Sequence, residues 1–568
     1  DTIPVIPDGT LTLDTISHFI VNVASNNSLW IDSDVYINNS FPINPPTIGV
    51  VTFDGLKGNG LAYVPGLPNV VNQRGIADYL TSKPIDLRYT AADSVHFSFY
   101  FQPQGTGNAP EGIDSLVVEF YSPVDSLWKH QWSLGGRPVQ DFQQVVIPIT
   151  DTMFLKNGFQ FRFKNYADLS GNLDHWNVDY VRLFAVRNRA NPHPEDIAFN
   201  RPSSILLKNY RQMPWNQYVA NPANEMNRDL SVYVRNNSAN PLVLTYTFNI
   251  KDQAGVVLAT QSSSDAINPL TSKGYTNNIG INFPTSTANF NQFTVENYMN
   301  TPTTDVLKAN DTLRHIQKFD NFYAYDDGVP EAGYGLNMNG AKLACQFVAN
   351  TPDDVTSVRI HFTPVNVQSQ IYPFLLTIWS SLNPETIIYQ DQSFSYPSHP
   401  ATELGFAEYF LPEPVRVSGN FYVGMVQVSN VELNIGFDKS FSTKDRIFYN
   451  LNGNWINTIF NGSLMIRPVL GPSNDPTVGI VEQAKPKATQ LLKVYPNPAR
   501  DRIFIEGITE TENTSLSIYD LYGRTVIQNI GNNLSNVDIS GLSEGMYILK
   551  VENKKTGLNH TSKIMVNR

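Results

Sequence analysis

The stretch Phe159-Gln160-Phe161-Arg162-Phe163 shows the pattern that decides the fold class of this chain. Its phenylalanines recur at every second position, so a β-strand places all three on one face and the two polar residues on the other. Residues 96–101, 230–235 and 421–426 have similar apolar or alternating patterns. We therefore expect an all-β protein, a multidomain chain of β-sandwich modules.

The composition of the whole chain supports this fold class. With 568 residues the chain exceeds the size of one hydrophobic core, so roughly three to five domains are expected. Aromatic residues make up 12% of the chain and charged residues 16%, which favours strands over disorder. The net charge of −11 argues against nucleic-acid binding, which needs a basic surface. No apolar run reaches the length of a membrane-spanning helix.

Three β units and a linker are predicted before the C-terminal region. Residues 1–190 carry many strand-like segments, a layout similar to a concanavalin- or MAM-type jelly roll. Residues 195–318 contain two long alternating segments around a polar turn and resemble an immunoglobulin-like domain. Residues 319–470 are predicted to form a further β-sandwich. Residues 471–490 contain prolines and polar residues without periodicity, which is typical of a linker.

The region 491–568 is predicted to be a small β-sandwich of its own. Pro496 and Pro498 fix the backbone and remove two hydrogen-bond donors, so the chain must bend out of the sheet there. Short apolar strands with turn signals between them follow. The three most distinctive motifs are Val494-Tyr495-Pro496-Asn497-Pro498, Ile518-Tyr519-Asp520-Leu521-Tyr522-Gly523-Arg524 and Gly545-Met546-Tyr547-Ile548.

These three motifs, in this order at the end of the sequence, resemble the type A C-terminal sorting domain of type IX secretion system cargo in Bacteroidetes. The resemblance implies that an outer-membrane machine recognises the domain and usually removes it. The residues expected to position the recognised surface are Pro496, Asn497, Pro498, Tyr519, Asp520, Gly523, Arg524, Gly545, Tyr547 and Lys563.

The same resemblance implies partners and a destination. The implied partners are an outer-membrane shuttle β-barrel, the translocon barrel and a sortase-like cysteine protease that cuts near the linker and can transfer the cargo to lipopolysaccharide. The implied destination is the cell surface or the medium, after transit through the periplasm and the outer membrane. We expect Asp1 to be a mature terminus left after export processing.

A tripeptide pattern predicts O-glycosylation. Asp followed by Ser or Thr and then an aliphatic residue or Met resembles the O-glycosylation acceptor of Bacteroidetes, and it recurs more often than the roughly two matches that average composition gives. Asp-Ser and Asp-Thr pairs are also ordinary turn openers, which leaves a structural alternative. The acceptor hydroxyls are those of Thr2, Thr15, Ser94, Ser115, Ser126, Thr152 and Thr312.

Two acidic segments are candidates for a calcium site, because hard oxygen ligands on flexible loops suit this ion. Asp326, Asp327 and Glu331 surround a Gly-Pro turn, and Asp179 lies near Trp176 in a strand-like segment. The alternative for the first segment is a solvated loop that leads into a strand and binds no metal. The alternative for the second is a core tryptophan, with the Asp179 carboxylate bonded to loop amides. No other cofactor is expected.

The sequence shows no convincing catalytic constellation. Residues 541–545 match the G-x-S-x-G nucleophile elbow around Ser543, but a strand-like segment follows where the elbow needs a helix, and only His560 follows it. Cys345, the one cysteine, lies in an alternating apolar segment and is predicted to be buried and unreactive. We therefore expect a protein that is not an enzyme.

The leading interpretation of the chain is a surface protein with an adhesin-like or gliding-associated role. Trp215, Tyr218 and Trp455 lie in loop-like segments and are candidates for presenting flat faces to glycans. The alternative is core packing, which an all-β chain with 12% aromatic residues requires of most of its rings. A secreted carbohydrate-active enzyme or hydrolase is a second interpretation, because paired catalytic carboxylates cannot be recognised from sequence. A permanent subunit of the translocon is a third, and it predicts that the C-terminal domain is never cleaved.

Overall fold

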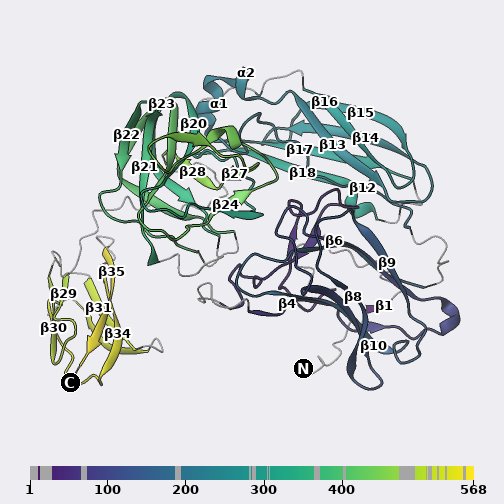
Figure 1. The fold of residues 1–568 in the computed structure, drawn as a ribbon, viewed down its shortest axis with the longest axis horizontal. Coiled ribbons are helices and arrows are strands. Elements are labelled where there is room, and N and C mark those ends of the chain that lie inside the picture. Colours follow the sequence, from purple (N-terminus) through teal and green to yellow (C-terminus); the bar gives the residue numbers. More distant parts are fainter. Residues whose placement is uncertain are drawn as a thin grey trace. The chain divides into compact units, whose positions relative to one another are not determined.

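The computed structural model divides the chain into two compact units, residues 1–475 and 476–568, both built from strands (Figure 1). The residues that it describes are 11–12, 29–64, 73–185, 193–279, 283, 290–302, 305, 307–363, 371–400, 404–471, 493–506, 508, 514–520, 524–530, 534–553 and 558–567. Within those ranges, no helix is both long and apolar enough to cross a bilayer. The predicted all-β class is confirmed.

The first part of unit 1 is a two-sheet sandwich. One sheet has the strand order β1–β5–β10–β7–β8, with β4 also paired to β10, and the other has the order β2–β3–β11–β6–β9. The strands are β1 (Leu11–Thr12), β2 (Tyr36–Asn38), β3 (Val50–Phe53), β4 (Arg74–Thr81), β5 (Ile85–Asp86), β6 (His96–Pro103), β7 (Ser115–Ser122), β8 (Leu127–Gly135), β9 (Gln143–Pro148), β10 (Asn157–Asp168) and β11 (Trp176–Phe184). A 3-10 turn, Ala91–Asp93, precedes β6.

The predicted phenylalanine face forms the core of this first sandwich. Phe159, Phe161 and Phe163 on β10 are fully buried. They pack against β6 of the opposite sheet, with ring centroids 4.6 Å apart for Phe97 and Phe161 and 4.9 Å apart for Phe99 and Phe163. Period-two alternation therefore locates the contact between the two sheets.

The middle part of unit 1 contains a three-stranded sheet, β12–β13–β16, and a four-stranded sheet, β15–β14–β17–β18. Their strands are β12 (Ile197–Phe199), β13 (Asp229–Asn236), β14 (Leu242–Lys251), β15 (Val257–Ile267), β16 (Ser272–Asn278), β17 (Asn291–Asn300) and β18 (Thr312–Phe319). Between β12 and β13 lie two short helices, α1 (Trp215–Ala220) and α2 (Pro222–Glu225), and a 3-10 turn covers Lys308–Asn310.

The last part of unit 1 contains a three-stranded sheet, β19–β24–β27, and a seven-stranded sheet, β22–β21–β23–β20–β25–β26, in which β28 also pairs with β20. The strands are β19 (Ala332–Tyr334), β20 (Lys342–Ile360), β21 (Phe374–Leu382), β22 (Glu385–Gln390), β23 (Ala407–Gln427), β24 (Ile435–Asp438), β25 (Ile447–Asn450), β26 (Trp455–Asn457), β27 (Ser463–Leu464) and β28 (Ile466–Val469). A 3-10 turn, Lys444–Arg446, precedes β25.

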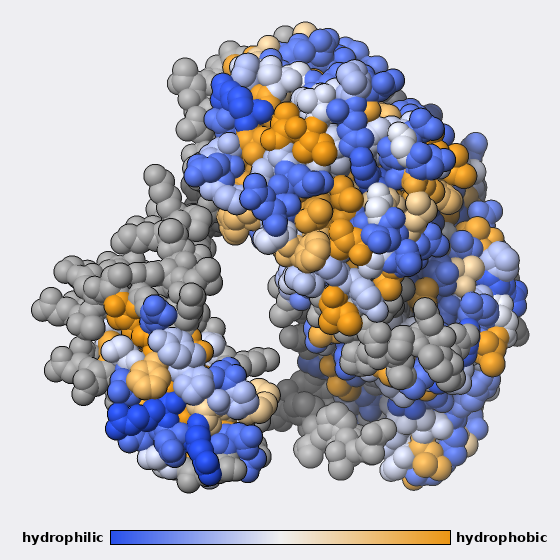
Figure 2. Space-filling view, turned by 60° about the vertical axis from the view of Figure 1, so that its left-hand side comes forward, coloured by the Kyte–Doolittle hydropathy of each residue, from blue (hydrophilic) through white to orange (hydrophobic). Residues whose placement is uncertain are grey.

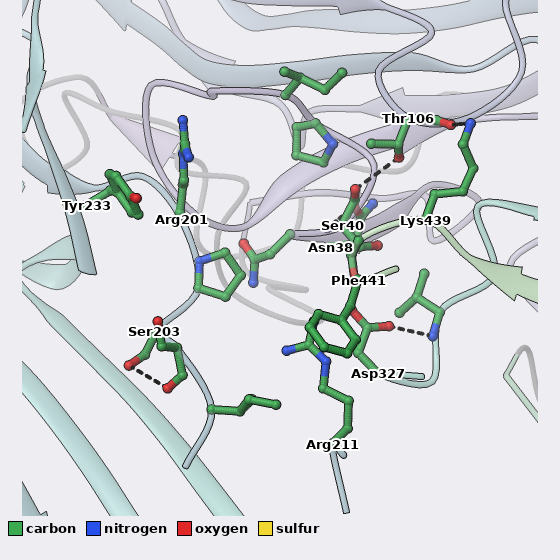
Figure 3. Close-up of a pocket in the computed structure, with 18 of the residues that line it drawn as sticks. Asn38, Ser40, Thr106, Arg201, Ser203, Arg211, Tyr233, Asp327, Lys439 and Phe441 are labelled. Atoms are coloured by element: carbon green, nitrogen blue, oxygen red, sulfur yellow. Dashed lines mark hydrogen bonds between the residues drawn. The ribbon is translucent and has the colours of Figure 1, made fainter. Parts of the chain in front are cut away.

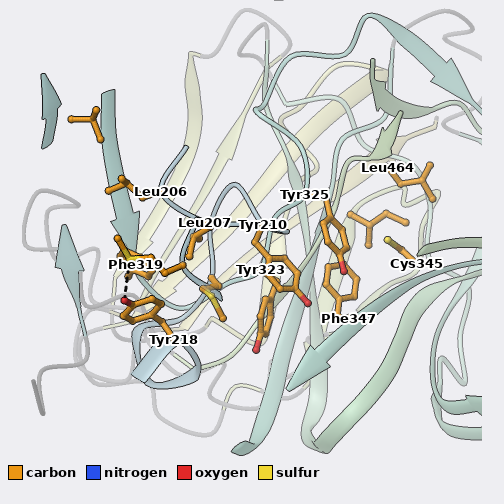
Figure 4. Close-up of a cluster of buried hydrophobic side chains, with 14 of the residues drawn as sticks. Leu206, Leu207, Tyr210, Tyr218, Phe319, Tyr323, Tyr325, Cys345, Phe347 and Leu464 are labelled. Carbon is orange, nitrogen blue, oxygen red and sulfur yellow. Dashed lines mark hydrogen bonds between the residues drawn. The ribbon is translucent and has the colours of Figure 1, made fainter. Parts of the chain in front are cut away.

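The middle and last parts of unit 1 share one continuous hydrophobic core. Tyr210, from the segment before α1, stacks on Tyr325 with ring centroids 4.7 Å apart, and Tyr325 stacks on Phe347 of β20 at 5.2 Å (Figure 4). The Tyr325 hydroxyl donates to the carbonyl of Gln346 at 2.7 Å. Aromatic rings thus continue the core across the junction between the two sandwiches.

The interpretation of residues 213–218 as an exposed, glycan-binding loop is wrong. Trp215 and Tyr218 belong to α1 and are fully buried. Both pack against Phe319 of β18, with ring centroids 5.1 Å and 4.9 Å away. Pro214 sets the start of this six-residue helix, which turns its aromatic residues toward the core. Trp455, the other candidate, is half-buried against Trp379, with ring centroids 5.5 Å apart.

Unit 2 is a small sandwich of its own, with a three-stranded sheet, β29–β30–β33, and a four-stranded sheet, β32–β31–β34–β35. Its strands are β29 (Lys493–Tyr495), β30 (Arg502–Glu506), β31 (Thr514–Tyr519), β32 (Thr525–Ile530), β33 (Asn536–Asp538), β34 (Gly545–Asn553) and β35 (Leu558–Val566). Its core is separate from the other cores and includes Ile503, Leu516, Ile518, Leu549 and Ile564, which are fully buried.

Candidate functional site

The proline motif of unit 2 lies beside the end of β35, the last strand. Pro496, Asn497 and Pro498 follow β29 directly and are exposed, as expected for a bend out of the sheet. The Asn497 side-chain oxygen accepts the backbone N–H of Met565 at 2.8 Å. Beyond the prolines, Ala499 forms a parallel bridge with Val566, and its N–H donates to the Met565 carbonyl at 2.7 Å. The first motif and the residue after it are therefore hydrogen-bonded to the end of β35.

Hydrogen bonds join the two described ends of the second motif, which lie at the end of β31 and just before β32. The backbone N–H of Asp520 donates to the carbonyl of Arg524 at 3.0 Å, and the Arg524 N–H donates to Asp520 Oδ1 at 3.0 Å. Arg524 Nε donates to Asp520 Oδ2 at 2.7 Å while the arginine side chain remains 77% exposed. This ion pair presents a cation at the surface. Gly523 lies outside the described residues.

The third motif begins β34. Gly545 pairs with Val566 of β35, and Ile548 pairs with Tyr519 of β31. Tyr547 is buried, and its hydroxyl donates to the carbonyl of Ser543 at 3.0 Å, so it supports the surface from inside. The structure therefore places the second and third motifs at one end of the four-stranded sheet, and the first motif, which begins in the other sheet, contacts the last strand at that end. Lys563 lies within β35, where only its backbone is described.

Ser543 and Cys345, the two candidate nucleophiles, lie next to or within strands. Ser543 precedes β34, so the strand predicted after it is confirmed, whereas a nucleophile elbow is followed by a helix. Cys345 on β20 is fully buried, as predicted, and burial raises the pKa of its thiol well above the usual value. The thiol is therefore protonated and inert at neutral pH.

The predicted glycosylation acceptors are mostly accessible. Ser94, Ser126, Thr152 and Thr312 are exposed, and Ser115 is half-buried at the start of β7. Ser94 and Ser126 have positive φ angles of 50° and 59°, which agrees with the turn-forming role of the Asp-Ser pair. Glycosylation of these residues stays a prediction. Thr2 and Thr15 lie outside the described part of the chain.

Two of the calcium candidates are engaged by protein groups. Asp326 is fully buried and forms an ion pair with Arg467, whose Nε donates to Asp326 Oδ2 at 3.1 Å. The Asp179 carboxylate accepts the backbone N–H groups of Thr47 at 3.0 Å and Tyr180 at 2.7 Å. This geometry is the loop-amide alternative stated for Asp179. Calcium binding by these residues stays a prediction.

The other two candidates join a cluster of carboxylates that includes Asp438. Asp438 Oδ2 accepts the Asp327 N–H at 2.8 Å, and Glu331 Oε2 accepts the Lys439 N–H at 2.6 Å. Burial, together with the neighbouring carboxylates, raises the pKa of Glu331 to about 8 and the pKa of Asp438 to about 7. Burial also raises the pKa of Asp327. The cluster therefore holds protons at pH values where exposed carboxylates are ionised.

The raised pKa values predict that unit 1 loses stability as the pH rises. Between about pH 4.5 and 8 the folded state retains a proton on Glu331 that the unfolded state has released, so its favourable contribution is lost across that window. The loss is on the order of a few kcal/mol, since each pKa unit corresponds to about 1.4 kcal/mol. Urea unfolding at several pH values measures it, and Glu331→Gln should flatten the dependence. An equally steep curve for this variant would contradict the assignment.

A cavity of about 790 Å³ lies beside this cluster in unit 1. Most of its wall comes from residues 36–45, 200–211 and 439–441, which are far apart in the sequence; the other lining residues are Thr106, Asn227, Ser231, Tyr233, Asp327 and Val329. Figure 3 shows Arg201, Arg211 and Lys439 around the cavity, with Asp327 on its edge. Sequence reasoning missed this site, because no single motif carries it. We call it the junction cavity.

A second acidic cluster was also missed. Among the described residues, Glu111, Asp114 and Asp174 form the one set of three potential metal ligands whose atoms lie within 4.8 Å of one another. Arg74 forms ion pairs with both Glu111, at 2.7 Å, and Asp114. Burial raises the pKa of Asp174 to about 7. Arg74 therefore already neutralises part of the negative charge that would attract a metal ion to this cluster.

The face of the molecule seen in Figure 2 mixes apolar and polar side chains. Several large apolar side chains are exposed in the last part of unit 1, including Ile459 at 81%, Phe460 at 59% and Phe410 at 58%. Scattered exposed apolar residues are normal for folded proteins. They do not by themselves define a site.

Comparison with protein families identifies the C-terminal unit. Residues 493–567 match the family model of the "Secretion system C-terminal sorting domain". The chain carries a type IX sorting domain. It is therefore a cargo of the type IX secretion system, exported to the cell surface or the extracellular space. The sorting domain covers the three motifs, and the match does not extend into unit 1.

Comparisons of the whole chain find only distant likenesses. A search of curated proteins finds no match. Among solved structures, Bacteroides uniformis β-glucuronidase 2 is 13% identical, with a TM-score of 0.23, over 49% of this chain and 29% of that one. A putative β-galactosidase from Bacteroides fragilis is 10% identical, with a TM-score of 0.22, over 51% and 41%.

A third solved structure is PorZ, a surface component of the type IX system of Porphyromonas gingivalis. It is 17% identical, with a TM-score of 0.13, over 22% of this chain and 15% of that one. The chain spans less than half the length of each of these three structures. Values this low support no inference about activity, so the function of unit 1 must be argued from its own residues.

Proposed function

We propose that unit 1 of this exported cargo is a binding module with an adhesin-like or gliding-associated role at the cell surface. The observation that carries the proposal is the junction cavity, whose volume of about 790 Å³ is in the range of small-molecule binding sites. Its wall mixes apolar side chains with four cationic ones, which suits recognition of a charged solute more than burial of a purely apolar surface. Adhesion of cells with and without the gene to glycan-coated surfaces tests the proposal, and equal adhesion would refute it.

An enzymatic role for unit 1 is the alternative. The carboxylates of the acidic cluster are the groups that such a role would use. Asp327 lies on the cavity edge, but its acidic neighbour Asp438 is fully buried and accepts backbone N–H groups. A glycosidase needs two carboxyl groups that both reach the substrate. A panel of polysaccharides incubated with the full chain tests this alternative. Hydrolysis that disappears in Asp327→Asn would favour the enzyme.

We further propose that the end of unit 2 where the three motifs meet docks to the export machinery. The proposed partners are the shuttle β-barrel, the translocon barrel and a sortase-like protease that cuts near residues 471–490 and can attach the cargo to lipopolysaccharide. The exposed Pro496–Pro498 segment and the exposed Arg524 side chain support this assignment. A permanent translocon subunit would instead keep its sorting domain, which a blot of mature surface protein would detect.

The docking proposal predicts that Arg524→Gln lowers export several-fold with little loss of stability. The Arg524–Asp520 pair is exposed on the arginine side, so its contribution to folding is about 0–1 kcal/mol. Quantitative surface labelling of intact cells measures export. Arg502→Gln is the matched control, because it removes an exposed arginine that pairs with Asp538 on the other sheet. Equal export of both variants would contradict a docking role for Arg524.

A further inference from the structure

The junction cavity is a built feature of unit 1, because hydrogen bonds fasten its walls to one another. The backbone N–H of Ile48 donates to the carbonyl of Phe199 at 3.1 Å, and the Asn200 side-chain amide donates to the carbonyl of Pro45 at 3.3 Å. On the far side of the first sandwich, the Asn172 amide donates to the carbonyl of Pro330 at 3.2 Å. These bonds join all three parts of unit 1 around the cavity.

The cavity gathers positive charge in an acidic protein. Arg201, Lys208, Arg211 and Lys439 line it, against the single carboxylate of Asp327. Within the described part of the chain, none of these four cations lies within 4.0 Å of a carboxylate oxygen, although the whole chain has a net charge of −11. Four cations without ion pairs in one concave site attract an anionic ligand.

Two of the arginines are held in place by aromatic rings. The Arg201 guanidinium lies 4.4 Å from the ring centroid of Tyr233, and the Arg211 guanidinium lies 5.0 Å from that of Phe441 (Figure 3). A stacked guanidinium has further N–H groups that can bind a carboxylate or sulfate, although Arg201 already donates to the Asn44 side-chain oxygen and Lys439 to the Thr106 carbonyl. The Arg211 Nε is buried and has no hydrogen-bond partner in the structure. A buried N–H group without a partner is costly, so a ligand atom at this position is favourable.

The remaining wall offers neutral hydrogen-bonding groups. Asn200 is 1% exposed, and its side-chain oxygen has no partner, although its amide nitrogen is bonded to Pro45 and to Ser272. The Ser203 and Ser204 side chains also line the cavity. An amide oxygen accepts hydrogen bonds, so it pairs with a hydroxyl or an N–H donor and not with an anion. The ligand is therefore expected to carry hydrogen-bond donors, such as hydroxyl groups, as well as negative charge.

We propose that the junction cavity binds an acidic oligosaccharide of a few carboxylated or sulfated sugar units. The cationic side chains form ion pairs with the acid groups, while Asn200 and the serine hydroxyls form hydrogen bonds with ring hydroxyls. This inference rests on the proposed binding role of unit 1 and names the class of its ligand. An acidic peptide matches the charge of the cavity as well, and its N–H groups could donate to the Asn200 oxygen, so a peptide is the competing ligand in the test below.

Isothermal titration calorimetry on the full chain tests the inference. The probes are tetragalacturonate, a chondroitin sulfate tetrasaccharide, uncharged maltotetraose and a tetraglutamate peptide. We expect one or both acidic sugars to bind, with an affinity that falls as salt is added, and we expect no binding of maltotetraose. The two acidic probes separate carboxylate from sulfate recognition. Binding of the peptide without the acidic sugars, or of maltotetraose as tightly as the acidic sugars, overturns the inference.

Charge-removing variants locate the binding. The double variant Arg201→Gln/Arg211→Gln should weaken binding at least tenfold, while Arg137→Gln/Arg416→Gln removes two exposed arginines outside the cavity and should leave it unchanged. Unaltered binding in the cavity variant overturns the inference. If that variant fails to fold, Lys208→Gln replaces it, because Lys208 is exposed and has only a 3.5 Å bond to the Ala223 carbonyl. The expected effect of Lys208→Gln is a several-fold loss, and no change overturns the inference.

A cell assay separates this inference from the broader proposal. Cells that lack the gene should adhere less than wild-type cells to a glycan surface, and cells with the double variant should adhere as poorly as the deletion strain to an acidic one. Loss of adhesion in the deletion strain but not in the variant leaves the binding role standing and refutes the junction cavity as its site. Full adhesion of the deletion strain refutes the binding role itself.

Discussion

Deletion of residues 561–568 should abolish surface display and leave the protein in the periplasm. These residues include most of β35, which pairs with β34 along its whole length and supplies the fully buried Ile564 and Val566. Each such side chain contributes about 1.5–3 kcal/mol by burial, a large share of the roughly 5–15 kcal/mol that stabilises a domain. The deletion also removes the partners of Asn497 and Ala499, so the proline motif loses its support.

Cell fractionation and protease treatment of intact cells measure this effect. Ile564→Val is the matched control, because it leaves β35 in place and costs only about 0.5–1.5 kcal/mol. This control should reach the surface at close to the wild-type level. A complementary test fuses residues 476–568 to an inert periplasmic reporter, which should then be exported. Normal display of the truncated protein would show that the last strand is dispensable for sorting.

Asp326→Ala should destabilise unit 1 by about 3–5 kcal/mol, because it leaves the Arg467 guanidinium unpaired in a site where that side chain is 15% exposed. Arg467 also stacks on Phe406, with its guanidinium 3.8 Å from the ring centroid, so the residue cannot easily turn toward solvent. Urea unfolding followed by tryptophan fluorescence measures the loss. All seven tryptophans lie in unit 1, so the signal reports on this unit alone.

Two controls separate the ion pair from a metal site. Asp354→Ala breaks an exposed pair with Arg416 and should cost less than about 1 kcal/mol. Calcium or a chelator should leave the wild-type unfolding curve unchanged if Asp326 serves Arg467. A midpoint that rises with added calcium in the wild type, and does not rise in Asp326→Ala, would instead support the calcium hypothesis.

The sequence predicts features that depend on neighbours along the chain. The alternation at residues 159–163 is enough to assign a strand and its buried face, because side-chain direction in a strand depends only on position. The prolines at 496 and 498 mark a bend for the same kind of local reason. The three motifs of the sorting domain are likewise short, contiguous segments, and the family match confirms the sorting domain that they indicated.

Features built from distant segments escaped prediction. Asp326 and Arg467 are separated by 141 positions, and no local pattern shows that one will neutralise the other. The junction cavity is lined by residues from all three parts of unit 1, so the clustering of its cationic side chains cannot be predicted without the three-dimensional arrangement of the sheets. Trp215 and Tyr218 were misassigned because a single helical turn after a proline is too short to show a 3.6-residue period.

The shared core of the middle and last sandwiches has a mechanical consequence when the chain is pulled. Tyr210, Tyr325 and Phe347 join the two parts by side-chain packing and not by a flexible connector. Under tension, a packed interface of this kind cannot lengthen as a flexible linker does, so both sandwiches should unfold in one event. Pulling experiments on single molecules should therefore record one rupture for residues 195–471 where two independent modules would give two.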